Sequence, residues 1–279
     1  MDVQSTGSAA GSGTTTTGPD RTTARDPLDA RDPAAARALA ILGLAGLTAA
    51  AFLIGVPHLL PQTAGISEIR QTISEYALTD VAWMFNAAVI ATAAASGAVL
   101  FALLLTRQAT WRSIDLVFGG LWVAGLLVIV AFPKHNWAVG PSADGQIHRI
   151  ASAVAFLSLP LAVMLLTRRA RAAGAAGGRS ARVAFWLGAG SLAWFSPLIV
   201  AMILAPSTGT PWFRAIPLGL IERGMVITEV AAIVALALWS LAATRSRVPA
   251  VNPPAAPERR SAMSTDPIPA ARGPRRPAG

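Results

Sequence analysis

Six long apolar blocks constrain this chain more than any other feature of its sequence. Each block has about 20 residues with few or no charges, which is the length that an α-helix needs to cross the hydrocarbon core of a bilayer. Because the blocks are continuously apolar and do not alternate with a period of two, they predict helices and not the strands of a barrel. We therefore expect an all-α, polytopic membrane protein, a six-transmembrane-helix bundle with helices near residues 38–60, 81–106, 114–132, 147–167, 183–204 and 220–243.

The two ends of the chain differ in composition from these blocks. Residues 1–36 are rich in Ser, Thr, Gly, Ala and Pro, and residues 245–279 are rich in Pro and Arg. Neither segment can bury enough apolar surface to offset the entropy of ordering its backbone, so we expect disordered tails on both sides of a transmembrane domain of residues 37–244. The first apolar block begins only at Ala38, so a cleaved signal peptide is not expected.

Charge predicts how the bundle sits in the membrane. The net charge is +9, and a basic balance of this size can indicate nucleic-acid binding. The arginines, however, flank apolar blocks and gather in alternate connections: the stretch between the fourth and fifth blocks holds Arg168, Arg169, Arg171, Arg179 and Arg182. Because basic residues stay on the cytoplasmic side, we expect a multi-pass cell-membrane protein with both termini in the cytoplasm. Its expected partners are membrane lipids, with no nucleic acid.

The first outward connection contains a repeated pattern. Ile66-Ser67-Glu68 recurs seven residues later as Ile73-Ser74-Glu75-Tyr76, which returns to nearly the same side of a helix. Ile66, Ile69, Ile73 and Ala77 would then form an apolar stripe, which suits a short helix lying in the headgroup layer. The alternative is an ordinary amphipathic connector. Ser74, Glu75 and Tyr76 are candidate site residues at this end of the bundle.

Two further groups of polar residues are expected near the same face. His148 begins the fourth block, where it either anchors the helix end or carries a proton or ligand contact at the mouth of a polar cavity. Glu222 and Arg223 begin the sixth block, and Glu229 follows seven residues after Glu222 on the same side of the helix. An acid facing lipid would cost several kcal/mol, so we expect Glu229 to face the bundle interior, as a structural hydrogen-bonding group or a functional one.

These motifs resemble those of the bacterial six-helix membrane proteins grouped as domain of unknown function 998. The resemblance covers residues 38–243 and is carried by four motifs in order, Ile73-Ser74-Glu75-Tyr76, Phe132-Pro133, Gly145 with His148, and Gly219-Leu220-Ile221-Glu222-Arg223. Such proteins often have an acid shortly after the Phe-Pro pair, whereas this chain has Lys134-His135, so a carboxylate role there would fall to Asp144. The resemblance implies the architecture and marks residues, but it implies no activity.

Two functions follow from these residues. The first is a non-enzymatic membrane protein with an outward-facing polar pocket for a lipid or small molecule, used in transport, sensing or envelope assembly, and lined by Ser74, Glu75, Tyr76, His148, Glu222, Arg223 and Glu229. The alternative is an intramembrane hydrolase or transferase with His148 as base, Glu222 or Asp144 orienting it, and Ser74 or Ser152 as nucleophile. The absence of cysteine excludes thiolate chemistry, and the histidine spacing predicts neither a metal site nor a cofactor. Stretches such as Gly188-Ala189-Gly190-Ser191 favour close helix packing, within one chain or between chains.

Overall fold

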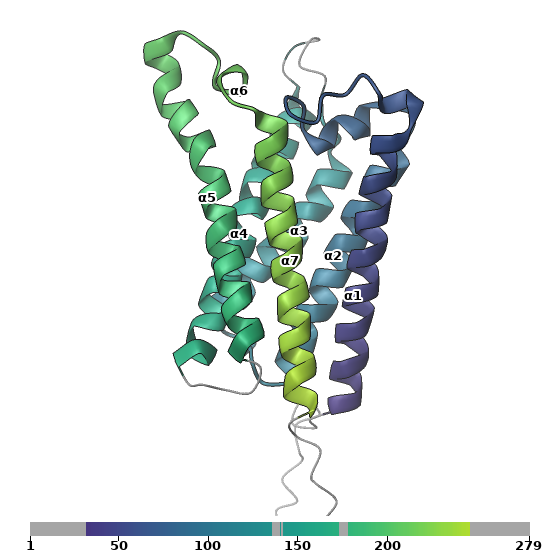
Figure 1. Ribbon diagram of the computed structural model, residues 1–279, viewed down its shortest axis with the longest axis vertical. Coiled ribbons are helices and arrows are strands. Elements are labelled where there is room, and N and C mark those ends of the chain that lie inside the picture. Colours follow the sequence, from purple (N-terminus) through teal and green to yellow (C-terminus); the bar gives the residue numbers. More distant parts are fainter. Residues whose placement is uncertain (1–31, 136–139, 141, 173–177, 246–279) are drawn as a thin grey trace, which may run out of the picture. The chain divides into compact units, whose positions relative to one another are not determined.

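The computed structural model of the protein describes residues 32–135, 140, 142–172 and 178–245 (Figure 1). Nearly all of both expected tails lies outside these residues. The helices are α1 (Pro33–Gly55), α2 (Ala82–Leu105), α3 (Ile114–Ala131), α4 (Ala143–Ala172), α5 (Gly178–Thr208), the short α6 (Trp212–Ala215) and α7 (Leu218–Arg245). Three 3-10 turns lie between α1 and α2, and they are η2 (Val56–Leu59), η3 (Pro61–Thr63) and η4 (Ile73–Leu78).

The predicted six-helix architecture is confirmed. Within the described residues, six helices are long and apolar enough to cross a membrane, namely α1 with η2, α2, α3, α4, α5 and α7. Several extend beyond the predicted apolar blocks, because polar residues at a helix end continue the helix out of the hydrocarbon. The amino terminus of α1 shows how such an end is fixed. Asp32 accepts hydrogen bonds from the backbone N–H groups of Ala34 and Ala35, and Pro33 occupies the first helical position, where no N–H is needed.

The helices pack in a ring in which α7 has the most neighbours. Successive helices from α1 to α5 pack side by side, and α7 packs against α1, α2, α4 and α5. Half of the residues in the most apolar stretch of α7 are buried inside the bundle, whereas only 17% are buried in the corresponding stretch of α5. Polar side chains on α7 therefore lie where several helices meet, whereas most of α5 faces the surroundings of the bundle.

Small residues bring the helix backbones close together, as expected in a membrane, where dispersion contacts drive helix association. A side-chain carbon added at Gly43 would lie 2.5 Å from Val99, so α1 packs closely against α2. One added at Gly125 would lie 3.0 Å from Ala155, so α3 packs closely against α4. Trp122 makes a polar contact between α3 and α2 in this part of the core. Its indole N–H donates a 3.0 Å hydrogen bond to the hydroxyl of Ser96.

The connection between α1 and α2, residues 56–81, contains no α-helix, so the short α-helix considered for Ile66–Ala77 does not form, whereas the alternative of an ordinary connector is not contradicted. The 3-10 helices η2 and η3 come first, turns and bends follow over residues 64–71, and η4 covers Ile73–Leu78. The physical reason is that backbone groups that would bond within such a helix bond instead to α7. The carbonyls of Glu68 and Gln71 accept from Arg223, and the N–H of Ile73 donates to Glu222.

The carboxyl-terminal part of α5 diverges from the rest of the bundle (Figure 1). Pro197 lies within the helix, where it removes a backbone hydrogen bond, and residues beyond it such as Ile203 are largely exposed. Gly209 ends the helix with a φ of +62°, a left-handed conformation that glycine adopts without strain. The chain then returns through α6 to α7, and α6 and the α1–α2 connection lie at the same end of the bundle, here called the α6 end (Figure 1).

Candidate functional site

The first turns of α7 hold the α1–α2 connection against the bundle. Gly219 has no side chain, and a carbon added there would collide with the carbonyl oxygens of Gln71 and Glu68. Only glycine therefore allows the connection to approach α7 this closely. Arg223, one turn later, donates from Nη1 to the same two carbonyls at 2.8 Å and 2.9 Å.

Glu222 completes this attachment from the neighbouring helix position. One of its carboxylate oxygens accepts a 2.6 Å hydrogen bond from the backbone N–H of Ile73, at the start of η4. The positive charges of Lys134 and Arg223 both act on this carboxylate. We call Gly219, Glu222 and Arg223, together with the backbone of residues 68–73, the α7 clasp. It fixes the α1–α2 connection by polar contacts between segments far apart in the sequence.

An ion pair links η4 to the segment that follows α3. Lys134 donates to the Glu75 carboxylate at 2.5 Å and to the Thr72 hydroxyl at 2.7 Å, and its side chain is only 9% exposed. The Thr72 hydroxyl also lies 3.0 Å from that of Ser74. The segment after the Phe132-Pro133 pair thus holds a cation opposite Glu75. These contacts tie residues 132–135 to the α1–α2 connection.

Tyr76 belongs to η4 in the same connection, and it is 1% exposed. Its ring centroid is 5.3 Å from that of His58 in η2. Burial raises the pKa of the Tyr76 phenol above its ordinary value, and the nearby Arg223 guanidinium partly opposes this shift. The phenol therefore stays neutral and acts as a packed, polar-tipped side chain under the α7 clasp.

His148 is also buried, near the start of α4. Its ring Nδ1–H donates a 2.9 Å hydrogen bond to the carbonyl of Phe132 at the end of α3. The Ser152 hydroxyl donates to the backbone carbonyl of His148 and not to its ring. His148 thus joins the ends of α3 and α4. Among the described residues, no hydrogen bond connects the imidazole ring of His148 to either serine that was predicted as a nucleophile.

Glu229 lies apart from these residues, within the bundle, as the sequence predicts for an intramembrane acid. Its side chain is 1% exposed, and one carboxylate oxygen accepts a 2.8 Å hydrogen bond from the hydroxyl of Ser191 on α5. The other carboxylate oxygen is buried without a partner among the described residues. A Gly224–Trp194 contact brings α5 and α7 together one turn away. The acid therefore belongs to the α5–α7 packing.

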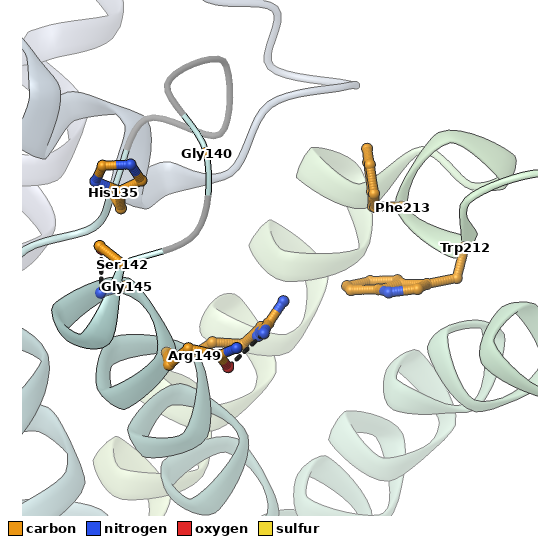
Figure 2. A pocket seen from close by; sticks show the side chains of 8 residues that line it. His135, Gly140, Ser142, Gly145, Arg149, Trp212 and Phe213 are labelled. Atoms are coloured by element: carbon orange, nitrogen blue, oxygen red, sulfur yellow. Dashed lines mark hydrogen bonds between the residues drawn. The ribbon is translucent and has the colours of Figure 1, made fainter.

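The structure brings six of the seven predicted site residues to the α6 end, in one connected set of contacts, and places Glu229 elsewhere. None of the seven lines the pocket at this end, so their role in contacting a ligand stays a prediction. The pocket, of about 230 Å³, lies instead between α4 and α6 and is lined by His135, Gly140, Ser142, Gly145, Gln146, Arg149, Trp212 and Phe213 (Figure 2).

Polar and aromatic groups face each other across this pocket. Arg149 extends from α4 toward the ring of Trp212 on α6, with Phe213 beside it (Figure 2). The Arg149 guanidinium donates a 2.5 Å hydrogen bond to the side-chain oxygen of Gln146, one turn earlier. The arrangement offers a cation and hydrogen-bond donors on one side and two apolar rings on the other. Such a surface can hold a molecule with an anionic group and an apolar body.

The pocket is coupled to the α7 clasp through two consecutive residues. Lys134 donates to Glu75 in η4, while the next residue, His135, lines the pocket. Gly145 lets α4 approach this segment closely, because a carbon added there would lie 2.6 Å from Cβ of His135. The Ser142 hydroxyl accepts from the N–H of Gly145 and caps the helix. The polar contacts around η4 therefore set the position of one pocket wall.

Comparison with known proteins decides the family. Residues 45–239, from the middle of α1 to near the end of α7, match the family described as a protein of unknown function, DUF998. The chain belongs to this family. No curated protein matches it, and no solved structure does. The DUF998 match includes the α7 clasp, the Lys134–Glu75 pair and every residue that lines the α4–α6 pocket.

Within this DUF998 chain, the described residues include no group of three or more histidines and acids placed to hold a metal ion. Sequence reasoning did not find the pocket itself. Two of its residues have features that the sequence does show: Arg149 is a cation at the start of a predicted helix, and Trp212 is an aromatic residue near the end of an apolar block. They lie far apart in the sequence, and only the course of α5 and α6 brings them together.

Proposed function

We propose that the protein is a non-enzymatic component of the cell membrane whose α4–α6 pocket faces outward and binds a lipid or small molecule, in a transport, sensing or envelope role. The observation that carries the proposal is the pocket itself, a cavity of about 230 Å³ that combines Arg149 and Gln146 with the rings of Trp212 and Phe213. Binding sites for small molecules are typically concave and mainly apolar, with a few polar groups that fix the orientation of the ligand.

In this proposal the predicted site residues near the pocket act by positioning. Glu75 holds Lys134, and Lys134 precedes the wall residue His135. His148 joins the ends of α3 and α4, one residue before Arg149. The Ser74 hydroxyl pairs with that of Thr72, and the Ser152 hydroxyl donates to the backbone carbonyl of His148 and not to its ring, which favours binding over a serine-histidine relay. The ligand would contact the residues of the pocket, and these polar side chains would keep the pocket in shape.

The distribution of basic residues supports an outward direction for the pocket. The end of the bundle opposite α6 carries Arg107 and Arg112 between α2 and α3, and Arg168, Arg179 and Arg182 around the α4–α5 connection. If that end is cytoplasmic, as the positive-inside rule requires, the α6 end and its pocket face outward.

Because the natural chain has no cysteine, single cysteines can report this orientation. Thr210→Cys, in the exposed connection before α6, should react with a membrane-impermeant maleimide added to intact cells. Thr110→Cys, exposed at the opposite end, should react only after the cells are permeabilised. Labelling of Thr110→Cys alone in intact cells would show that the pocket faces the cytoplasm.

Ligand binding is tested on the purified, reconstituted protein by native mass spectrometry of retained small molecules and added lipids. Wild type should hold about one molecule per chain in a saturable manner. The double variant Trp212→Ala/Phe213→Ala, which removes the apolar wall, should bind about tenfold more weakly, equivalent to roughly 1.4 kcal/mol. Trp186→Ala is the matched control, because this exposed tryptophan lies on α5 away from the pocket. Equal retention by the double variant and wild type would contradict the pocket as the binding site.

A further inference from the structure

We infer that the α4–α6 pocket takes the phosphate of an anionic lipid headgroup, with the acyl chains lying along the exposed face of α4. This inference rests on the proposed function and names the class of ligand. It is argued from the charge of the pocket, from the position of its aromatic residues, and from the surface of α4 that continues from it into the apolar part of the bundle.

The pocket is suited to an anion because no carboxylate is found among the described residues that line it. Its ionisable lining residues are Arg149 and His135, and its remaining polar lining side chains are Ser142 and Gln146. The planar guanidinium of Arg149 can bind two phosphate oxygens with parallel N–H donors. A second guanidinium, that of Arg214, lies 5.9 Å from the ring centroid of Phe213 but does not line the pocket. Asp144 lies in the first turn of α4 but does not line the pocket.

The position of the pocket at the start of α4 also favours an anion. Gly145, Gln146 and Arg149 lie in the first two turns of a 30-residue helix, whose amino-terminal end carries a partial positive charge. The opposite wall is formed by Trp212 and Phe213, and tryptophan is enriched at the level of lipid headgroups because its ring is apolar and its N–H is polar. A phosphate between Arg149 and Trp212 would therefore sit at the depth of the headgroup layer.

The face of α4 that lines the pocket continues toward the middle of the membrane as an exposed apolar stripe. Residues four apart share a helix face, so Ile150 and Val154 follow Gln146 along one line. Both are exposed, at 62% and 37%. The stripe reaches the level at which α5 covers α4, where Gly188 approaches the backbone of Pro160. Acyl chains attached to a headgroup in the pocket would have an apolar surface to lie on, which a soluble phosphate compound would not use.

The test compares ligands of stated chemistry on the full chain, delipidated in detergent. Dissociation constants would be measured for dioleoyl phosphatidylglycerol, which is anionic, for dioleoyl phosphatidylcholine, which is zwitterionic, and for glycerol 3-phosphate. The variants are Arg149→Gln, which removes the charge, and Arg149→Lys, which keeps the charge without the planar fork. Arg182→Gln is the control, because it removes the same charge from the opposite end of the bundle, where the side chain is also exposed.

We expect the anionic lipid to bind about tenfold more tightly than the zwitterionic one, and glycerol 3-phosphate to bind more weakly than either. Arg149→Gln should abolish the preference, Arg149→Lys should reduce it, and Arg182→Gln should leave it unchanged. Equal binding of both lipids, unaffected by Arg149→Gln but lost in Trp212→Ala/Phe213→Ala, would overturn the phosphate assignment and leave the proposed pocket intact. Glycerol 3-phosphate binding as tightly as the anionic lipid would overturn the lipid as the source. If no ligand saturates, the proposed function fails as well.

Discussion

Replacing Gly219 with alanine is expected to lower the free energy of unfolding by about 3 kcal/mol, a large effect for one added methyl group. The added carbon would meet the carbonyl oxygens of Gln71 and Glu68, which are backbone atoms and cannot rotate away as a side chain can. The connection must then move off α7. Because the same two carbonyls accept from Arg223, this movement also breaks the charge-assisted hydrogen bonds of the α7 clasp.

The measurement is unfolding in mixed micelles with increasing fractions of denaturing detergent, compared with wild type. Gly97→Ala is the matched control, since a carbon added at this α2 position meets no atom within 4 Å. There the substitution should be neutral or stabilise by up to about 1 kcal/mol, through helix propensity alone. Equal effects of the two substitutions would show that the contact between Gly219 and the connection is not a tight one.

The bundle could be predicted from the sequence because the bilayer imposes a length on every span. The uncharged stretch from Val81 to Thr106 predicts a helix that the structure places at Ala82–Leu105. Helix ends are predicted less well where polar residues continue the helix beyond the hydrocarbon. The apolar block begins at Ile147, whereas α4 begins at Ala143, because Ser142 caps the helix and Asp144 favours its first turn.

The α1–α2 connection shows why the same reasoning failed outside the membrane. The spacing of Ile66, Ile69 and Ile73 fits a helix, but Ile69 is 58% exposed and only Ile73 is buried. Local periodicity describes a segment by itself, whereas this backbone is held by hydrogen bonds to Glu222 and Arg223, about 150 positions later in the chain. Tertiary contacts at such separation cannot be read from a spacing.

Only part of the candidate site could be predicted from the sequence. Buried or membrane-embedded charges are rare, so Glu222, Arg223 and Glu229 stand out in an apolar sequence. Their prominence reflects the cost of burying a charge, which the α7 clasp and the hydrogen bond from Ser191 partly offset. Residues such as Gln146 and Phe213 are ordinary for a helix end and become a pocket only where α4 and α6 face each other. A charged residue within an apolar block is therefore easier to recognise in the sequence than a pocket formed by ordinary residues from two helices.

Replacing Arg223 with leucine is expected to release the α1–α2 connection, with a loss of about 3 kcal/mol in the free energy of unfolding. The guanidinium supplies hydrogen bonds to the carbonyls of Glu68 and Gln71, and it is a cation near Glu222. Without it, two carbonyls lose their donor and a half-buried acid loses a compensating charge. The released connection should be cut faster by trypsin after Arg70, because cleavage needs local unfolding.

Arg223→Lys gives the graded comparison for this prediction. Lysine keeps the charge but lacks the planar set of donors, so its cleavage rate should lie between those of wild type and Arg223→Leu. Arg149→Leu is the control, since it removes an arginine at the same end of the bundle whose guanidinium donates to Gln146 on its own helix, and cleavage after Arg70 should stay at the wild-type rate. Accelerated cleavage in Arg149→Leu as well would mean that the connection is held by the overall charge of this end of the bundle. Acceleration confined to the Arg223 variants would assign the attachment to the directed hydrogen bonds of one guanidinium, through which Glu75, Lys134 and the pocket wall at His135 are kept in place.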